Sequence, residues 1–332
     1  MSREFKALVV EQPEKKVFVR SIRARSVDDL PEGNLLVKVH YSSLNFKDAL
    51  SATGNPGVTR NYPHTPGIDA AGVVVDCSSE DFSPGDEVIV TSYDLGMETD
   101  GGFGQMVRVP SRWAIKLPEG LSLKQSMMLG TAGLTAALAV QELIDNGVAP
   151  DKGSVLVTGA TGGVGSLAVA ILAKAGFRVA AVTGKPEQTD YLKSIGATEV
   201  LCRSMVLEGN DRPMLKGVWA GVVDCVGGEM LAAAIKATAH NGVVVCCGLV
   251  ASPDLHINVF PFILRGVRLI GIDSAECSME KRQRAWQALA GQWLIDQLAA
   301  MVDEVGLDGL EEKIQLILQG KLARRVLITL PE

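Results

Sequence analysis

The sequence predicts an α/β protein with a mostly β first part and a second part built on a doubly wound parallel sheet. Two observations support this prediction. Short apolar, β-branched segments separated by turn residues fill the chain from Phe5 to about Leu117. From about Ser154 onward, continuous apolar strands alternate with helical segments, which is typical of a parallel sheet covered on both faces.

The first part contains a series of predicted strands. Turn residues such as SPGD and TDGGFG separate them, and their alternating apolar residues favour a mostly β, partly barrel-like domain. The predicted strands are KALVVEQ (6–12), NLLVKVHYSSL (34–44), AAGVVVD (70–76), DEVIVTSY (86–93) and FGQMVRVP (103–110).

The hydrophobic period changes after Leu121. The following stretch predicts a helix from about Thr131 that ends near Gly147. Strand segments then alternate with helices, and a last strand, RRVLITL, closes the chain. The alternating strands are SVLVTG (154–159), RVAAVTG (178–184), TEVLC (198–202), AGVVDCVG (220–227), GVVVCCG (242–248) and VRLIGIDS (267–274).

Composition excludes several function classes. The chain has 332 residues, a net charge of −6 and no basic stripe, so we expect no nucleic-acid partner. The first residues carry charges and lack a signal-peptide core, and the uncharged run 153–173 holds five glycines, so we expect no membrane span. Six scattered cysteines and four histidines predict no metal site. They favour buried or half-buried thiols in a reduced, cytoplasmic protein.

The stretch VLVTGATGGVG (155–165) predicts a phosphate cradle. A strand reaches Thr158 and a helix follows from about Ser166, with glycines at 159, 162, 163 and 165 in the turn. Glycine lets the backbone approach a pyrophosphate, and the helix N-terminus faces the anion. The strict GxGxxG fingerprint is absent, because Thr161 and Val164 stand where it requires glycine. The prediction of a dinucleotide site therefore depends on the repeating β/α units around the turn.

The same turn fits TGxxxGxG of the short-chain dehydrogenases. Those enzymes need a later Tyr-x-x-x-Lys pair for proton transfer. The only tyrosine after the cradle is Tyr191, and Ile195 stands four residues later. This alternative fails, so we expect the catalytic part to precede the cofactor part.

The residues after the second strand of this part favour NADPH. An NAD site usually places Asp or Glu at this strand end, to bind the ribose 2′-hydroxyl. Here Thr183, Gly184 and Lys185 occupy it, and Arg203 follows the next strand. A hydroxyl and two cations suit a 2′-phosphate, so the predicted cofactor is NADPH.

With these motifs the chain resembles the medium-chain dehydrogenase/reductases, within them the zinc-free quinone oxidoreductase and acrylyl-CoA reductase subgroup. The resemblance implies a GroES-like catalytic domain over 1–126, completed by 275–332, and a Rossmann domain over 127–274. It also implies a homodimer formed by pairing of VRLIGIDS. The motifs that carry it are SSLNFKDAL (42–50), PGIDAAGVV (66–74), GTAGLTAALAV (130–140), VLVTGATGGVG (155–165), DYLKSIGA (190–197) and PFILRGVRLIGIDS (261–274).

The resemblance implies hydride transfer without zinc. The zinc-dependent relatives use Cys, His and often Glu as ligands, and SSLNFKD and TPGIDAAG offer none of these residues. A site without a Lewis acid can still reduce an acceptor that is already electron-poor. We therefore expect NADPH-dependent reduction of the conjugated C=C of a short 2-enoyl thioester of the acrylyl-CoA type. The alternatives are an NADPH:quinone oxidoreductase and, in another class, a non-catalytic NADPH-binding protein.

The resemblance also implies site residues. Asn45, Phe46, Asp48 and Thr131 are expected at the catalytic end, where Phe46 also contacts the cofactor. Close relatives often have tyrosine in place of Phe46, and a phenyl ring donates no hydrogen bond. Solvent, Asn45 or Tyr93 could then serve as the donor. The expected cofactor contacts are Phe46, Thr161, Gly162, Gly163, Val164, Thr183, Gly184, Lys185, Arg203, Leu249 and Ser274.

Overall fold

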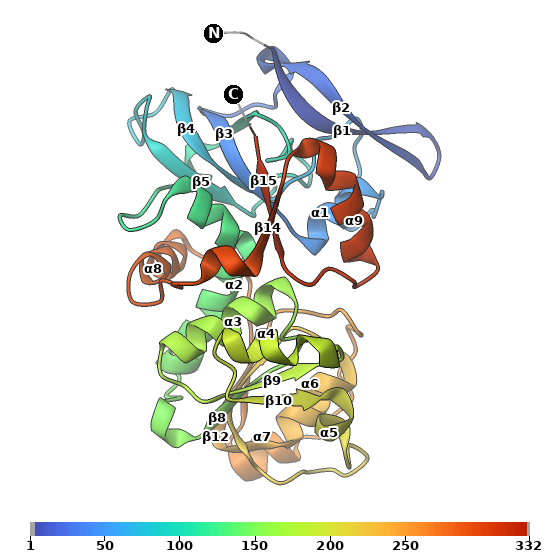
Figure 1. Ribbon diagram of the computed structural model, residues 1–332, viewed down its shortest axis with the longest axis vertical. Helices are drawn as coiled ribbons and strands as arrows, with labels where there is room; N and C mark the ends of the chain where they lie inside the picture. Colours follow the sequence, from blue (N-terminus) through green and yellow to red (C-terminus); the bar gives the residue numbers. More distant parts are fainter. Residues whose placement is uncertain (1–3, 331–332) are drawn as a thin grey trace. The chain divides into compact units, whose positions relative to one another are not determined.

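The computed structural model describes residues 4–330, which form two compact units. The first unit contains the chain up to Thr131 and again from Leu298, and the second contains Ala132–Gln297. Figure 1 shows them coloured along the sequence. The resemblance implied boundaries after residues 126 and 274. In the structure the second boundary lies after helix α8 (Met279–Ala290) rather than before it.

The first unit is mostly β, as the sequence predicts. Strands β1 (Glu4–Glu14) and β2 (Val17–Ser26) form an antiparallel hairpin. A seven-stranded sheet has the order β14-β15-β3-β4-β5-β7, and β6 pairs with β3. Its strands are β3 (Leu35–Leu44), β4 (Asp69–Cys77), β5 (Glu87–Thr91), β6 (Met106–Val109), β7 (Ala114–Lys116), β14 (Val302–Val305) and β15 (Arg325–Thr329).

The last strand of the chain completes this sheet. β15 pairs antiparallel with β3, so Val326 lies opposite Leu44. Buried side chains from β3, β5 and β15 form the core, where helices α1 (Phe46–Ala52) and α9 (Leu310–Leu318) also pack. The pairing brings residues far apart in sequence to the start of α1, next to the end of β3.

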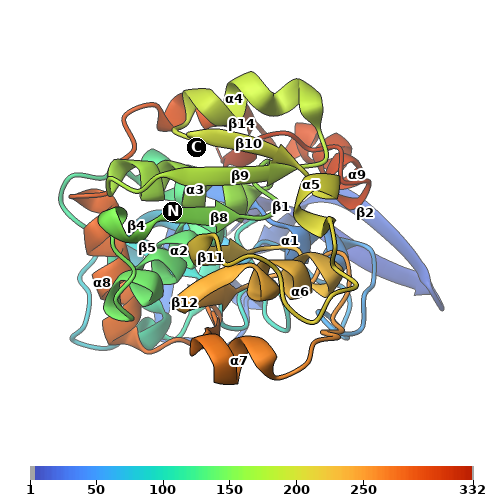
Figure 2. The ribbon, with the colours of Figure 1, turned by 90° about the horizontal axis from the view of Figure 1, so that it is seen from below.

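The second unit contains a six-stranded sheet, and all of its strand pairs are parallel. The strand order is β10-β9-β8-β11-β12-β13, and in Figure 2 the labels from β10 to β12 follow in that order. From β8 the chain adds strands toward β10 on one side of the sheet and then, from β11 to β13, on the other side. This reversal of the strand order confirms the predicted doubly wound sheet. The strands are β8 (Ser154–Val157), β9 (Val179–Thr183), β10 (Glu199–Cys202), β11 (Trp219–Asp224), β12 (Thr238–Cys246) and β13 (Arg268–Gly271).

Helices connect the strands of this sheet, as a parallel sheet requires. α3 begins at Gly163, three residues earlier than the sequence indicated, because its first turn is built from the cradle itself. The connecting helices are α3 (Gly163–Lys174), α4 (Thr189–Ser194), α5 (Arg203–Leu207), α6 (Gly228–Lys236) and α7 (Phe260–Arg265). Short 3₁₀ helices lie at 27–29, 111–113, 150–152, 186–188, 298–301 and 307–309.

Helix α2 (Leu123–Asp145) joins the two units through the chain. The sequence predicted a helix only from about Thr131. The structure has helical turns before it as well, with a break at Gly130, where φ is 55° and ψ is −157°. By length and composition α2 could cross a membrane, but 83% of its most apolar window is buried in the structure. Its apolar surface is therefore that of a core helix.

Candidate active site

The predicted phosphate cradle is the turn between β8 and α3. Gly159 has a φ of +59°, and the Gly162 N–H donates to the Gly159 carbonyl oxygen at 2.9 Å. A β-carbon on Gly165 would lie 2.3 Å from that same oxygen, so the helix can approach the turn only with glycine there. The N–H groups of the first helical turn have no partner within the helix. This cradle therefore fits a pyrophosphate. The residues expected to bind it, Thr161 to Val164, lie in the turn and at the start of α3.

Two buried side chains tie the cradle to the other half of the sheet. Thr158 Oγ1 donates to Asp224 Oδ1 at 2.6 Å and accepts from the Cys225 N–H at 3.0 Å. The other Asp224 oxygen accepts from the Gly227 N–H at 2.8 Å. Burial raises the pKa of Asp224 against these hydrogen bonds, which favour the carboxylate. The bond joins the ends of β8 and β11, where the strand order reverses.

The predicted 2′-phosphate residues lie at the ends of β9 and β10. Thr183 Oγ1 accepts from the Lys185 N–H at 3.0 Å, which fixes the turn after β9. Arg203 is exposed at the start of α5 and packs against Gly184, where a β-carbon would lie 2.7 Å from the guanidinium carbon. Since β9 and β10 are paired neighbours, their adjacent ends together carry the Thr183 hydroxyl and the two cations, Lys185 and Arg203.

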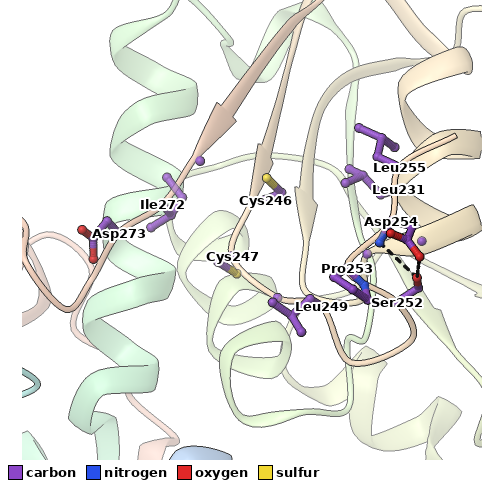
Figure 3. A pocket seen from close by; sticks show the side chains of 14 residues that line it. Leu231, Cys246, Cys247, Leu249, Ser252, Pro253, Asp254, Leu255, Ile272 and Asp273 are labelled. Carbon is purple, nitrogen blue, oxygen red and sulfur yellow. Dashed lines mark hydrogen bonds between the residues drawn. The ribbon is translucent and has the colours of Figure 1, made fainter. Parts of the chain in front are cut away.

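A pocket of about 480 Å³ lies at the carboxyl ends of β11, β12 and β13. Figure 3 shows Cys247 and Leu249 on the segment after β12, and Ile272 and Asp273 on the segment after β13. Ser274 follows next, and its Oγ accepts from Thr135 Oγ1 at 2.8 Å. The full lining is Gly227, Gly228, Leu231, Cys246, Cys247, Gly248, Leu249, Ser252, Pro253, Asp254, Leu255, Gly271, Ile272 and Asp273.

These three features follow one another along one edge of one sheet. The cationic strand ends belong to β9 and β10, the cradle to β8, and the pocket to β11, β12 and β13. Ligands of such sheets bind outside the carboxyl ends of the strands, at the point where the strand order reverses. The edge therefore fits an extended dinucleotide with its 2′-phosphate end at β9 and β10.

In the first unit, Asn45 and Asp48 form the start of α1. The Asn45 N–H donates to Asp48 Oδ2 at 2.7 Å, and the Ile68 N–H donates to Asp48 Oδ1 at 2.8 Å. Asp48 is fully buried. Burial, together with the nearby charge of Asp69, raises the pKa of Asp48 to about 7, although three hydrogen bonds oppose the shift. Asp48 therefore links the start of α1 to Ile68, the residue before β4.

Asp69 is the centre of a buried network next to Asn45. Its carboxylate accepts from Ser43 Oγ at 2.5 Å, Asn45 Nδ2 at 2.7 Å and Thr131 Oγ1 at 2.6 Å. Arg325 Nη1 donates to Asn45 Oδ1 at 3.1 Å, and Arg325 Nη2 donates to Ser43 Oγ at 2.7 Å. Both ends of the Asn45 amide are thus bound by charged partners, which fix its orientation.

The break in α2 makes this network possible. A β-carbon on Gly130 would lie 2.3 Å from Ser43 Oγ and 2.5 Å from Asp69 Oδ2. The backbone of Gly130 turns the Thr131 N–H toward the Asp69 carboxylate, 3.0 Å away. The structure therefore brings Thr131 together with Asn45 and Asp48 around Asp69.

Phe46 and Tyr93 differ in their surroundings: the ring of Phe46 is exposed, whereas that of Tyr93 is stacked on another ring. Phe46 is the first residue of α1, and its side chain is 44% exposed. Tyr93 follows Ser92, both at positive φ, and its ring stacks on Trp113 with centroids 5.4 Å apart. Ser92 Oγ lies 3.0 Å from Thr131 Oγ1, so this strained turn is bound to the Asp69 network.

Sequence reasoning missed Asp69, Arg325 and Gly130. Asp69 and Gly130 lie within the motifs PGIDAAGVV and GTAGLTAALAV. An acidic residue among apolar ones and a glycine next to a predicted helix could have identified them. Arg325 gave none, because it is 280 residues from Asn45 and only the pairing of β15 brings it there.

The cysteines differ in part from expectation. All six are free, but Cys202 is exposed, so the prediction of a buried or half-buried thiol is wrong there. It is the last residue of β10. Within residues 4–330, no three His, Cys, Asp or Glu side chains come together as a group that could hold a metal ion.

Comparison with protein families gives two matches. Residues 31–119 match the family model described as alcohol dehydrogenase GroES-like domain. Residues 163–291 match the model described as zinc-binding dehydrogenase. The first range lies in the first unit and the second in the second unit.

Relatives resemble the whole chain. It is 45% identical to the putative quinone oxidoreductase YhfP of Bacillus subtilis over 99% of this chain and 100% of that protein. It is 44% identical to the acrylyl-CoA reductase AcuI of Ruegeria pomeroyi over 98% of each chain. The Salmonella enterica oxidoreductase yhdH, solved in complex with NADP, has a TM-score of 0.95 at 39% identity and matches 98% of this chain and 100% of its own. Bacillus subtilis yhfP, solved with NAD, has a TM-score of 0.96 at 44% identity, with 99% of this chain and 100% of that chain covered.

The raised pKa of Asp48 predicts a pH dependence of stability. A carboxyl whose pKa is near 7 when folded and 3.8 when unfolded binds more protons in the folded state between these values. The free energy of unfolding of the native protein should therefore fall, relative to that of Asp48→Asn, as pH rises from about 4 to about 7, by at most about 1.4 kcal/mol per pH unit. Denaturant unfolding of both proteins across this range measures the difference. A difference that stays constant with pH would contradict the assignment.

Proposed function

Since the chain belongs to the medium-chain dehydrogenase/reductases, in the quinone oxidoreductase and acrylyl-CoA reductase subgroup, we propose that it reduces short 2-enoyl thioesters with NADPH. It is an oxidoreductase, and its fold is that of a GroES-like domain with a Rossmann domain. The observation that carries the proposal is the succession of cationic strand end, glycine cradle and pocket along the carboxyl edge of the second sheet.

Each part of that edge has a role toward the cofactor. The first-turn amides of α3 at 163–164 would bind the pyrophosphate, and Lys185 and Arg203 the 2′-phosphate. The pocket that Leu249 lines would take the nicotinamide, with Ser274 next to its rim. Bound there, the cofactor supplies a hydride for an electron-poor carbon. NADP in yhdH fits this assignment, and NAD in yhfP makes the 2′-phosphate contacts the point to test.

The first unit would orient the acceptor. Phe46 presents an exposed apolar ring, which can contact an alkene but donates no proton. The Asn45 amide is bound by Asp69 and Arg325, so it is a fixed group rather than a proton source. In an enoyl thioester the developing negative charge spreads onto the carbonyl oxygen, and we propose that water delivers the proton to the α-carbon.

A second candidate is reduction of quinones, which the name of YhfP at 45% identity favours. Quinones need the same hydride donor and no thioester recognition. A non-catalytic NADPH-binding protein would keep the same cofactor edge and show no turnover. We place the enzyme in the cytoplasm, where reducing conditions keep its six thiols free.

Steady-state NADPH oxidation distinguishes these functions. Purified protein is supplied in parallel with acrylyl-CoA, crotonyl-CoA and a small quinone. We expect kcat/KM for acrylyl-CoA to be at least about tenfold above that for the quinone. Equal or faster quinone turnover would support the second candidate, and no turnover with any acceptor would leave only cofactor binding.

The 2′-phosphate assignment predicts a change in cofactor preference. Lys185→Ala with Arg203→Ala should raise KM for NADPH by about a hundredfold or more, because two charge-assisted hydrogen bonds of about 1.5–3 kcal/mol each are lost. KM for NADH should change little. Lys193→Ala, which removes an exposed cation from α4, is the matched control. If KM for the two cofactors rises equally, these residues do not read the 2′-phosphate.

We further propose a homodimer formed at β13. This strand is the last in the sheet order, and α7 beside it exposes Ile263 and Leu264 by 69% and 60%. An open strand edge with exposed apolar side chains favours pairing with a second copy. Light scattering should give a dimer mass for the native protein and a lower mass for Ile263→Ser with Leu264→Ser. Val17→Ser, at an exposed valine of β2, should remain dimeric; a monomeric native protein would overturn the proposal.

A further inference from the structure

Two thiols lie in contact at the pocket, and one of them, Cys247, belongs to its lining. The Sγ atoms of Cys225 and Cys247 are 3.7 Å apart, at the ends of β11 and β12. The strands are paired up to Asp224 and Cys246, and the Cys247 N–H continues the ladder by donating to the Asp224 carbonyl oxygen at 2.9 Å. The two cysteines are therefore opposed as the next step of a parallel strand pair.

The backbone around the two thiols is tightly packed. A β-carbon on Gly248 would lie 2.2 Å from the Cys225 carbonyl oxygen, so the segments after the two strands touch through their main chains. Adjacent strands lie about 4.8 Å apart, within the Cα separation of about 4.4–6.8 Å that disulfides span. The sulfurs need to close only from 3.7 Å to about 2.05 Å.

Two of the other cysteines contact hydroxyl groups instead. Cys77 Sγ lies 3.3 Å from Ser79 Oγ, and Cys202 Sγ lies 3.1 Å from Ser204 Oγ. The Ser204 hydroxyl lowers the pKa of Cys202, which is also exposed, so Cys202 should be alkylated early. The contact with Cys247, together with burial, raises the pKa of Cys225, so this pair should react more slowly.

We propose that Cys225 and Cys247 are an oxidative modification site, which a two-electron oxidant of the peroxide class converts to a disulfide. One sulfur attacks a peroxide oxygen, the O–O bond breaks and a sulfenic acid forms, with release of water or an alcohol. The second sulfur attacks the sulfenic sulfur and releases water. The two thiols lose two electrons and two protons, and a dithiol reductant reverses the reaction.

The disulfide would act on the pocket. Cys247, Gly248 and Leu249 line it, and Gly227 lines it two residues after Cys225. Drawing the two sulfurs together moves the first residues of both segments. This effect rests on the proposed function: the disulfide weakens NADPH binding, and bound NADPH slows formation of the disulfide.

Peptide mapping tests the bond itself. The full chain is treated with hydrogen peroxide, free thiols are blocked with N-ethylmaleimide, and the tryptic digest is analysed by mass spectrometry. The expected product links the peptide that contains Cys225 to the one that contains Cys247. Cys246→Ser should retain this link and Cys247→Ser should lose it. Absence of the link, or its persistence in Cys247→Ser, would overturn the proposal.

NADPH fluorescence titration tests the consequence. The oxidised protein should bind NADPH at least about tenfold more weakly than the reduced protein, and dithiothreitol should restore the affinity. Cys225→Ser should show no change in affinity on peroxide treatment. An unchanged affinity in protein that carries the disulfide would overturn the effect on the pocket. Failure of the reduced protein to bind NADPH would instead refute the proposed function, and the mapped bond would stand.

Discussion

The approach of α3 to the turn after β8 is the constraint on which the proposed cofactor site depends. Gly165 leaves room for the Gly159 carbonyl oxygen, and any side chain at 165 would push the helix away from the strand. With the helix in place, its first-turn amides lie at the carboxyl end of β8, and Thr158 can bond to Asp224 across the point where the strand order reverses. The cationic strand ends and the pocket then lie to either side of one cradle.

In the first unit, the arrangement of the site depends on buried charged residues. Asp48, Asp69 and Arg325 are all buried, which is costly unless each charge is bound. Glycine at 130 lets the second half of α2 turn its Thr131 N–H onto Asp69, and Arg325 closes the other side of Asn45. The result is an asparagine held in one orientation beside an exposed Phe46. Arg325 belongs to β15, so the last strand of the chain supplies one of the charges in this network.

Local patterns were sufficient to predict the strand-rich first part, the parallel sheet, the cradle and the cationic turn after β9, because each depends on neighbours in sequence. The start of α2 was missed because Gly130 interrupts the helix without ending it. Arg325 and the Cys225–Cys247 contact depend on which strands pair, and a linear reading does not contain that information. Asp69 was within reach, since an acidic residue inside an apolar strand must have buried partners.

We propose that one edge of the second sheet binds the dinucleotide in a single direction. A crystal structure of the protein with NADPH tests it most directly. We expect the 2′-phosphate at Lys185 and Arg203, the pyrophosphate at the first turn of α3, and the nicotinamide in the pocket lined by Leu249. Density for the nucleotide in the opposite direction, or away from the turn between β8 and α3, would contradict it.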